Sequence, residues 1–186
     1  MSKLKVACDV DEVINNMIDK AIELYNNRYG AELTKDMFVE YDIYKCLPFE
    51  EAEAFIDLFL QEELWDSVEP VNDAQWGLKY LVNNGFEVYL ATATHYGNFQ
   101  RKVDWIEKYF PFIDKKNIIC IHNKSLLDVD FIIDDCAENL INCKWPHRIL
   151  VDRPWNQQPR YGAYHLYRTY DWHETIDIIT TIAKEE

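Results

Sequence analysis

The sequence of 186 residues predicts an α/β fold, in which a parallel sheet is covered by helices on both faces and a helical block is inserted after the first strand. Two observations lead to this prediction. From residue 72 onward, short apolar runs of strand type alternate with amphipathic helix patterns, and this alternation is typical of parallel sheets. Residues 31–70 contain no further clear strand and carry helix patterns instead.

The first strand is expected over residues 4–10, a short and mostly apolar run. A helix should follow, because apolar residues recur at steps of three and four over residues 14–29, and Gly30 is placed to end it. In the inserted block, Thr34 is suited to cap a short helix and Pro48 to start another. The apolar face of that second helix is predicted to carry Phe49, Ala52, Ile56, Phe59 and Leu60.

Alternating strands and helices fill the second half of the chain. One helix is expected to end at Gly85, and another to run over residues 98–110 ahead of Pro111. The last helix should start at Asp171, since Asp171 and Glu174 have the spacing of a capping box. The remaining elements are strands at 86–92, 117–121, 129–134 and 148–152, and a short helix at 137–143.

Length and composition indicate one folding unit that carries an insertion. With 186 residues, 48% of them hydrophobic and 15% aromatic, the chain can bury a full core. We expect residues 1–13 and 71–186 to form the α/β core, and residues 14–70 to form the helical insertion.

The charge of the chain excludes several classes of partner. The sequence has 19 Lys and Arg against 33 Asp and Glu, which gives a formal net charge of −14. This field repels phosphate backbones and anionic lipid headgroups, so neither a long nucleic acid nor a membrane surface is an expected partner. The N-terminal apolar run is too short for a signal peptide, and no later window approaches a membrane span, so a cytoplasmic location is expected.

Polar side chains gather where the predicted strands end. In an open parallel sheet, ligands bind beyond the carboxyl ends of the strands, at the point where the strand order reverses. The residues that the strands deliver to this edge are Asp9 and Asp11, Thr92 and Thr94, Lys124, and Asp134 with Asp135.

Each of these residues also has an ordinary explanation. Pairs of aspartates arise by chance in acidic proteins, Thr92 suits a strand through its branched Cβ, and Lys124 alone suits a solvated surface. Asp134 and Asp135 could simply cap the helix that follows them. Together and in this order, however, the residues fit phosphoryl transfer through an aspartate nucleophile.

The chemistry of that reaction explains why these residue types are needed. A carboxylate that attacks a phosphate dianion meets like-charge repulsion, which Mg²⁺ reduces; Asp9, Asp135 and the carbonyl of Asp11 could hold the ion. One of the carboxylates could also attack. The Asp11 side chain could protonate the leaving oxygen and later take a proton from water. Thr92 could donate a hydrogen bond to the phosphoryl group, and Lys124 could balance its charge.

The segments "DVDEV", "VYLAT", "NK" and "DFIIDD" resemble, in this order, the four motifs of the haloacid-dehalogenase-like hydrolase superfamily. Other segments are similar to the 5'(3')-deoxyribonucleotidase family, so that the resemblance covers nearly the whole chain: "LWDSVEPVNDA", "HNKSLLDVDFIIDD", "ILVDRPWNQ" and "YDWHETI". The resemblance implies a Mg²⁺-dependent phosphatase of nucleoside monophosphates that works through an aspartyl-phosphate. It also implies a Rossmann-like doubly wound core with a small helical cap.

Carried over by position, the resemblance makes Asp9 the nucleophile and Asp11 the acid and base, with Thr92 and Lys124 holding phosphate. Its metal site comprises Asp9, Asp11 and Asp135, helped by Asp134. The sequence departs from the family at two positions. Glu12 stands where the family usually has Gly, and Ala93 stands where it tends to place a hydroxyl, so that Thr94 becomes the candidate for that phosphate contact.

Substrate choice is expected to come from the cap, because bases are held by stacking and by a few hydrogen bonds. The cap side offers several aromatic residues, most of which should form its own core. Trp65, in the segment that returns to the core, is the first candidate for contact with a base, and Met17 is the second. The segment 152–157 either lines the site or is a surface turn.

Two alternatives to a nucleotidase stay open. The first is a phosphatase of the same mechanism that acts on another small phosphomonoester, such as a sugar phosphate. The second is a non-catalytic module that binds nucleotide or phosphate, against which the retained Asp11 counts, because such a module needs no acid for a leaving group. Exposed aromatic side chains on the cap are compatible with a homodimer.

Overall fold

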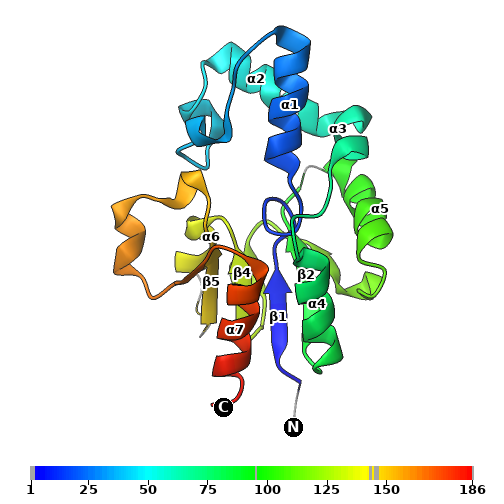
Figure 1. The fold of residues 1–186 in the computed structure, drawn as a ribbon, viewed down its shortest axis with the longest axis vertical. Helices are drawn as coiled ribbons and strands as arrows, with labels where there is room; N and C mark the ends of the chain where they lie inside the picture. Colours follow the sequence, from blue (N-terminus) through cyan, green and yellow to red (C-terminus); the bar gives the residue numbers. More distant parts are fainter. Residues whose placement is uncertain (1–2, 95, 143, 145–146, 186) are drawn as a thin grey trace.

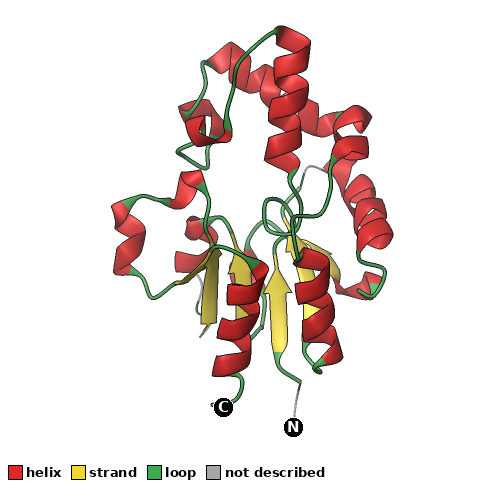
Figure 2. Ribbon diagram, viewed as in Figure 1, coloured by secondary structure: helices red, strands yellow, loops and turns green. Residues whose placement is uncertain are grey.

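A six-stranded parallel sheet forms the centre of the protein, which is described by a computed structural model over residues 3–94, 96–142, 144 and 147–185 (Figures 1 and 2). The strand order is β3-β2-β1-β4-β5-β6, so that the order reverses next to β1. This reversal is the point at which ligands bind in doubly wound sheets. The strands are β1 Lys5–Cys8, β2 Glu87–Thr92, β3 Ile118–Cys120, β4 Phe131–Asp134, β5 His147–Val151 and β6 Tyr167–Thr169.

Both faces of the sheet are buried, as the apolar strand sequences predict. Along β1, Val6 and Cys8 pack into the larger of two apolar clusters and Ala7 packs into the smaller one, because successive side chains of a strand point to opposite faces. β1 pairs with β2 on one side and with β4 on the other. The predicted Rossmann-like doubly wound parallel sheet is therefore confirmed.

Among the described residues, four α-helices cover this core, and α4 and α7 lie side by side on one face (Figure 1). Their bounds are α4 Ala74–Asn83, α5 Phe99–Tyr109, α6 Ala137–Ile141 and α7 Trp172–Ile182. α7 starts as the capping-box spacing predicts, because the Asp171 side chain accepts a hydrogen bond of 2.8 Å from the Glu174 backbone N–H. The buried side chains Trp172, Ile176 and Ile179 then face the core.

Gly77 allows α4 and α7 to approach closely. A Cβ at this position would collide with Cε3 of Trp172 and would lie 3.0 Å from its Cδ2. We expect Gly77→Ala to lower the free energy of unfolding by about 1–2 kcal/mol, because overpacking of this size outweighs the helix propensity that alanine adds. Urea denaturation measures this change. Gly162→Ala is the control, since a Cβ there meets nothing within 4 Å; an equal change in both variants would contradict the prediction.

The chain between β1 and α4 forms a separate group of helices beyond the carboxyl ends of the strands (Figure 1). Its α-helices are α1 Met17–Tyr29, α2 Phe49–Asp57 and α3 Glu62–Ser67. α1 ends at Gly30 as predicted, with a left-handed φ of 64° that glycine adopts without strain. The two segments that connect this group to the core lie next to each other, and Asn15 and Pro70 form an isolated antiparallel bridge between them. We call this group the cap; its exact bounds, 14–70, stay a prediction.

Short 3-10 helices connect the larger elements. They are η1 Lys35–Met37, η2 Ile43–Lys45, η3 Leu58–Leu60, η4 Tyr96–Asn98, η5 Lys115–Asn117, η6 Lys124–Leu126, η7 Pro154–Asn156 and η8 Pro159–Ala163. Within the described residues, no helix combines the length and the apolar character needed to cross a bilayer.

Several local predictions were wrong. The first strand is shorter than residues 4–10, and the helix after β4 ends at Ile141, while residue 143 lies outside the described residues. Tyr29, Phe49 and Leu60 were expected to be buried but are exposed, Phe49 by 70%. Strand β6 was not predicted, because its three residues carry no apolar pattern; they form a strand by pairing with β5.

Candidate active site

Three aspartates meet at the carboxyl ends of β1 and β4, which are neighbouring strands. Asp9 follows β1 directly and its backbone N–H donates to the Ile133 carbonyl at 2.9 Å, while Asp134 ends β4 and Asp135 follows it. One carboxylate oxygen of each aspartate lies within 4.8 Å of those of the other two. All three are buried. The sheet thus brings together three of the residues that the sequence analysis placed at this edge.

Lys124 joins this acid cluster from η6, after β3. Its Nζ lies 2.9 Å from Oδ1 of Asp9 and 2.6 Å from Oδ2 of Asp134. Burial alone would lower the pKa of Lys124, but the two carboxylates outweigh it and hold that pKa above its ordinary value. Asp134 also accepts hydrogen bonds from the backbone N–H of Cys136 and the side chain of Asn139. With both oxygens of Asp134 engaged, Asp9 and Asp135 are the more available metal ligands.

The electrostatics of the cluster suit a divalent cation. Burial raises the pKa of Asp9 to about 6; Lys124 opposes this increase, and the carboxylates of Asp134 and Asp11 add to it. Burial, followed by the charges of Asp134 and Asp9, also raises the pKa of Asp135 well above its usual range. A single ammonium cannot balance three buried carboxylates. Because the donors are all hard oxygens, the set fits Mg²⁺, which prefers such ligands.

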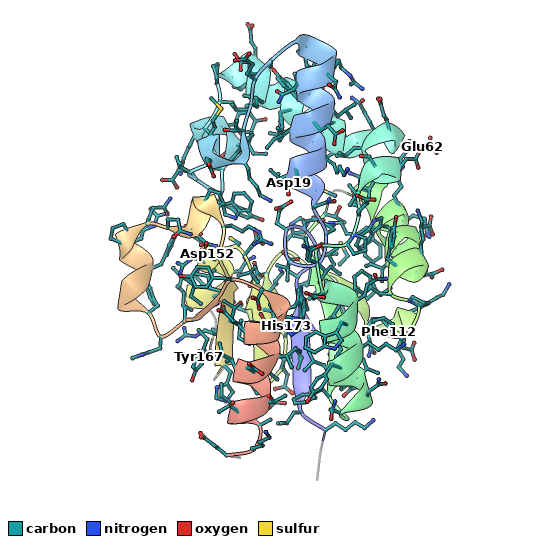
Figure 3. The ribbon with its side chains drawn as sticks, in the orientation of Figure 1. Asp19, Glu62, Phe112, Asp152, Tyr167 and His173 are labelled. Atoms are coloured by element: carbon teal, nitrogen blue, oxygen red, sulfur yellow. The ribbon has the colours of Figure 1, made fainter. Side chains whose placement is uncertain are left out.

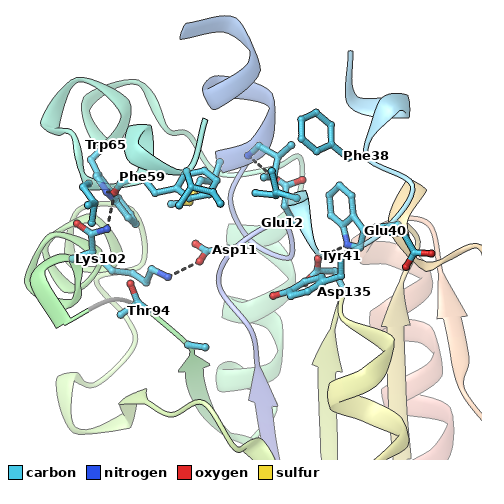
Figure 4. A pocket seen from close by; sticks show the side chains of 18 residues that line it. Asp11, Glu12, Phe38, Glu40, Tyr41, Phe59, Trp65, Thr94, Lys102 and Asp135 are labelled. Carbon is cyan, nitrogen blue, oxygen red and sulfur yellow. Dashed lines mark hydrogen bonds and ion pairs between the residues drawn. The ribbon is translucent and has the colours of Figure 1, made fainter. Parts of the chain in front are cut away.

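Asp11 stands apart from the cluster and is held by other partners. Its Oδ2 lies 2.5 Å from Nζ of Lys102 (Figure 4), and its Oδ1 accepts a hydrogen bond of 3.0 Å from Nδ2 of Asn15. Lys102 lies on α5, is 1% exposed, and also donates to Oγ1 of Thr92 at 2.9 Å. Lys102 thus links two of the predicted catalytic residues.

Lys102 was not predicted as a site residue, although the sequence contains a signal for it. The apolar face of α5 contains Trp105 and Ile106. Lys102 lies three positions before Trp105 and four before Ile106, and therefore on the same face. A lysine at that place is rarely buried without a carboxylate partner. Its position on the apolar face of the first helix after β2 therefore pointed to the site.

The two threonines after β2 have different environments. Thr92 is fully buried, with its hydroxyl next to Lys102, whereas Thr94 and Ala93 line the large cavity described below. The phosphate contacts predicted for Thr92 and Thr94 stay predictions.

Glu12, where the resemblance led us to expect glycine, turns its side chain toward the cap. It is 3% exposed, and its carboxylate accepts a hydrogen bond of 2.6 Å from the Ile18 backbone N–H at the start of α1. Nζ of Lys35, in η1, lies 2.6 Å from Oε2 of Glu12 and 2.7 Å from Oδ2 of Asp19, which Figure 3 labels at the core end of α1. On the core side, Arg153 donates to the Glu12 carbonyl. Glu12 therefore connects the loop after β1 with the cap and with the segment after β5.

We expect Glu12→Gly to lower the free energy of unfolding by about 1–3 kcal/mol. The backbone φ of Glu12 is 58°, so glycine would relieve some strain, but the buried bonds to Ile18 and Lys35 would be lost. Asp73→Gly is the matched control, because Asp73 also has a left-handed φ, 61°, and its side chain is exposed. Chemical denaturation of both variants measures the difference; a stabilised Glu12→Gly protein would contradict the prediction.

A cavity of about 350 Å³ lies between the cap and the core (Figure 4). Asp11 and Asp135 line it from the core, and both predicted substrate contacts, Met17 and Trp65, line it from the cap. Its apolar wall otherwise comprises Ile18, Phe38, Tyr41, Ile43, Ile56, Phe59 and Leu60. Such a cavity, mostly apolar with a few convergent polar groups, is typical of small-molecule sites.

In the segment after β5, Trp155 and Asn156 are buried, and Trp155 belongs to this site. Trp155, in η7, is 5% exposed, lines the cavity, and donates from Nε1 to Oδ2 of Asp135 at 2.8 Å. Asn156 donates to the Asp135 carbonyl at 2.9 Å. Nζ of Lys35 stands 5.9 Å from the centre of the Trp155 ring. The interpretation of residues 152–157 as a surface turn is therefore excluded for Trp155.

Comparison with known proteins places the chain in a family. A model of the family described as 5' nucleotidase, deoxy (pyrimidine), cytosolic type C protein matches residues 3–186. A 5'(3')-deoxyribonucleotidase from Clostridium acetobutylicum is 30% identical over 174 residues, which are 94% of this chain and 93% of that protein. A 5'(3')-deoxyribonucleotidase from Bacillus subtilis is 25% identical, over 92% of this chain and 96% of that protein.

Solved structures agree on the fold. A haloacid dehalogenase-like hydrolase from Streptococcus pneumoniae has a TM-score of 0.67 at 10% identity and covers 95% of this chain and 98% of its own. A hydrolase of the same superfamily from Deinococcus radiodurans, solved with bound phosphate and sodium, has a TM-score of 0.66 at 12% identity, over 93% of each chain. The chain therefore belongs to the deoxy (pyrimidine), cytosolic type C family of 5' nucleotidases, shares its fold with haloacid-dehalogenase-like hydrolases, and is a phosphoric monoester hydrolase that acts as a nucleotide phosphatase.

Proposed function

We propose that this chain hydrolyses deoxynucleoside or nucleoside 5'- or 3'-monophosphates to nucleoside and phosphate, in a Mg²⁺-dependent reaction through an aspartyl-phosphate on Asp9. The observation that carries the proposal is the convergence of Asp9, Asp134 and Asp135 beside a cavity that Asp11 and Asp135 also line. The 5'(3')-deoxyribonucleotidases among the relatives support the same substrate class.

In this proposal each core residue has one role. A carboxylate oxygen of Asp9 attacks phosphorus while the bond to the leaving oxygen breaks, and Asp11 protonates that oxygen. Water then attacks phosphorus, Asp11 takes its proton, and the bond to Asp9 breaks to release phosphate. Lys124, held by two carboxylates, stays charged and offsets the negative charge of the phosphoryl group.

Asp9, Asp135 and the carbonyl of Asp11 would hold Mg²⁺, with Asp134 as a further neighbour. The ion would supply positive charge that reduces the repulsion between the carboxylate and the phosphate. Lys102 would hold the Asp11 carboxylate in position, since its ammonium bonds both Asp11 and Thr92. Thr92 and Thr94 would contact the phosphate.

The cap, residues 14–70, would hold the nucleoside. Trp65 is 8% exposed, and its ring lies beside Lys102, with Nζ 5.8 Å from the ring centre. The indole N–H donates to the Phe59 carbonyl at 3.0 Å, which fixes the ring plane. An oriented aromatic plane and the thioether of Met17, in one cavity wall, suit contact with a flat base.

Phosphate release by the purified protein tests the proposal. With Mg²⁺, we expect turnover of nucleoside monophosphates, concentrated on the deoxy forms, across a panel of 5'- and 3'-monophosphates and sugar phosphates. Excess EDTA should abolish the turnover, and Mg²⁺ added back should restore it. Turnover confined to sugar phosphates would contradict the substrate class, and turnover unaffected by EDTA would contradict the metal requirement.

A further inference from the structure

Two hydrogen bonds from η7 to Asp135 have no role in the proposed reaction so far. Two consecutive residues contact this one aspartate: the indole N–H of Trp155 binds its side chain at 2.8 Å, and the amide of Asn156 binds its backbone carbonyl at 2.9 Å. All three residues are at most 5% exposed. Both the main chain and the carboxylate of Asp135 are thus held by a segment that lies 20 residues later in the sequence.

The η7 segment is itself firmly anchored, so it can act as a fixed support. The same Asn156 amide donates to the Val151 carbonyl at the end of β5, at 2.8 Å. Its side-chain oxygen accepts from Nη1 of Arg168 on β6, at 2.7 Å, and Arg168 also bonds Asp152. The support for Asp135 is therefore built from the ends of two further strands.

We propose that Trp155 is a positioning residue for the divalent cation: its indole N–H fixes the orientation of the Asp135 carboxylate. This inference rests on the metal site of the proposed function. Because the indole engages Oδ2, Oδ1 is the oxygen that remains for the cation. Groups that orient metal ligands in this way contribute strongly to metal affinity.

A buried carboxylate needs such a partner here because its neighbours repel it. Asp135 lies within 4.8 Å of the carboxylate oxygens of Asp9 and Asp134, and Lys124 bonds those two aspartates. The hydrogen bond from Trp155 offsets part of this repulsion, because it gives the Asp135 carboxylate a donor. An indole suits this place, because it donates one hydrogen bond and brings no charge that would compete with the cation.

The test is the affinity of the substrate-free protein for Mg²⁺, measured by isothermal titration calorimetry. Trp155→Phe removes the N–H donor and keeps an aromatic ring, and we expect it to weaken Mg²⁺ binding roughly 10- to 100-fold. If this variant does not fold, β-(3-benzothienyl)-alanine at position 155 keeps the shape of indole without its N–H.

Trp105→Phe is the matched control. Trp105 is also buried and its indole N–H donates at 2.9 Å, to the Val68 carbonyl, so the variant loses a comparable bond away from the acid cluster. Weakened Mg²⁺ binding in the Trp155 variant alone supports the inference. Unchanged binding, or equal weakening in both variants, overturns it. Absence of Mg²⁺ binding in the parent chain would instead overturn the metal site of the proposed function, on which the inference rests.

Discussion

Asp9→Asn is expected to lower phosphate release by roughly four orders of magnitude or more, because an amide cannot form the aspartyl-phosphate. The change is nearly isosteric, so the fold should persist. Burial disfavours the Asp9 carboxylate, as its raised pKa of about 6 indicates. In the absence of metal we therefore expect Asp9→Asn to leave the free energy of unfolding, measured by chemical denaturation, no lower than in the parent chain. Mg²⁺ should raise the Tm of the parent chain more than that of the variant, because a ligand that binds only the folded state stabilises it.

Asp66→Asn is the control for this variant. Asp66 lies on α3 and is exposed, so the same chemical change there should alter neither turnover nor the effect of Mg²⁺ on the Tm. Turnover retained by Asp9→Asn would assign the nucleophile to another residue, with Asp135 the first candidate.

Lys102→Met is expected to lower kcat by roughly 100-fold, at the lower end of what a positioned acid or base contributes. The variant keeps the length of the side chain and removes the ammonium that contacts Asp11 at 2.5 Å and Thr92 at 2.9 Å. If Lys102 acts through Asp11, the pH dependence of kcat should change shape while the KM for nucleotide changes little. Steady-state kinetics over a range of pH values measures both quantities.

Lys108→Met separates this role from a general effect of charge. Lys108 lies on the same helix, is exposed, and contacts the ring of Tyr109. We expect its kinetics to match those of the parent chain. A Lys102→Met protein with unchanged kcat would show that the contact between Lys102 and Asp11 is structural only.

The residues that were predicted well are those whose position follows from sheet geometry. Asp9 comes directly after β1 and Asp135 comes directly after β4, and the ends of neighbouring parallel strands meet at one edge. The strand pattern and the order of elements along the chain were therefore enough to predict that these two aspartates lie close together. Met17 and Trp65 also reached the cavity, since each lies near a crossing between cap and core.

The residues that were missed depend on contacts between elements that no local pattern specifies. The apolar stripe of α5 hinted at Lys102, but its partner Asp11 lies 91 positions away. The partners of Glu12 lie on the cap and on the loop after β5, so its conformation follows from how the two pack. Phe49 was predicted to be buried because its spacing fits the apolar face of a helix. It is the first residue of α2, however, and its side chain is exposed.

The chain passes from core to cap at Asn15 and returns at the neighbouring Pro70, and this arrangement affects how such proteins can diversify. Because the chain leaves the sheet and returns to it at adjacent points, the intervening block behaves as an insertion whose ends already meet. A block of different length or composition could be grafted between these two points without changing any strand pairing. The acid cluster on the core and the cap wall of the cavity can then change independently. We expect chimeras joined at this bridge to fold, whereas chimeras joined within β1 or β4 should not.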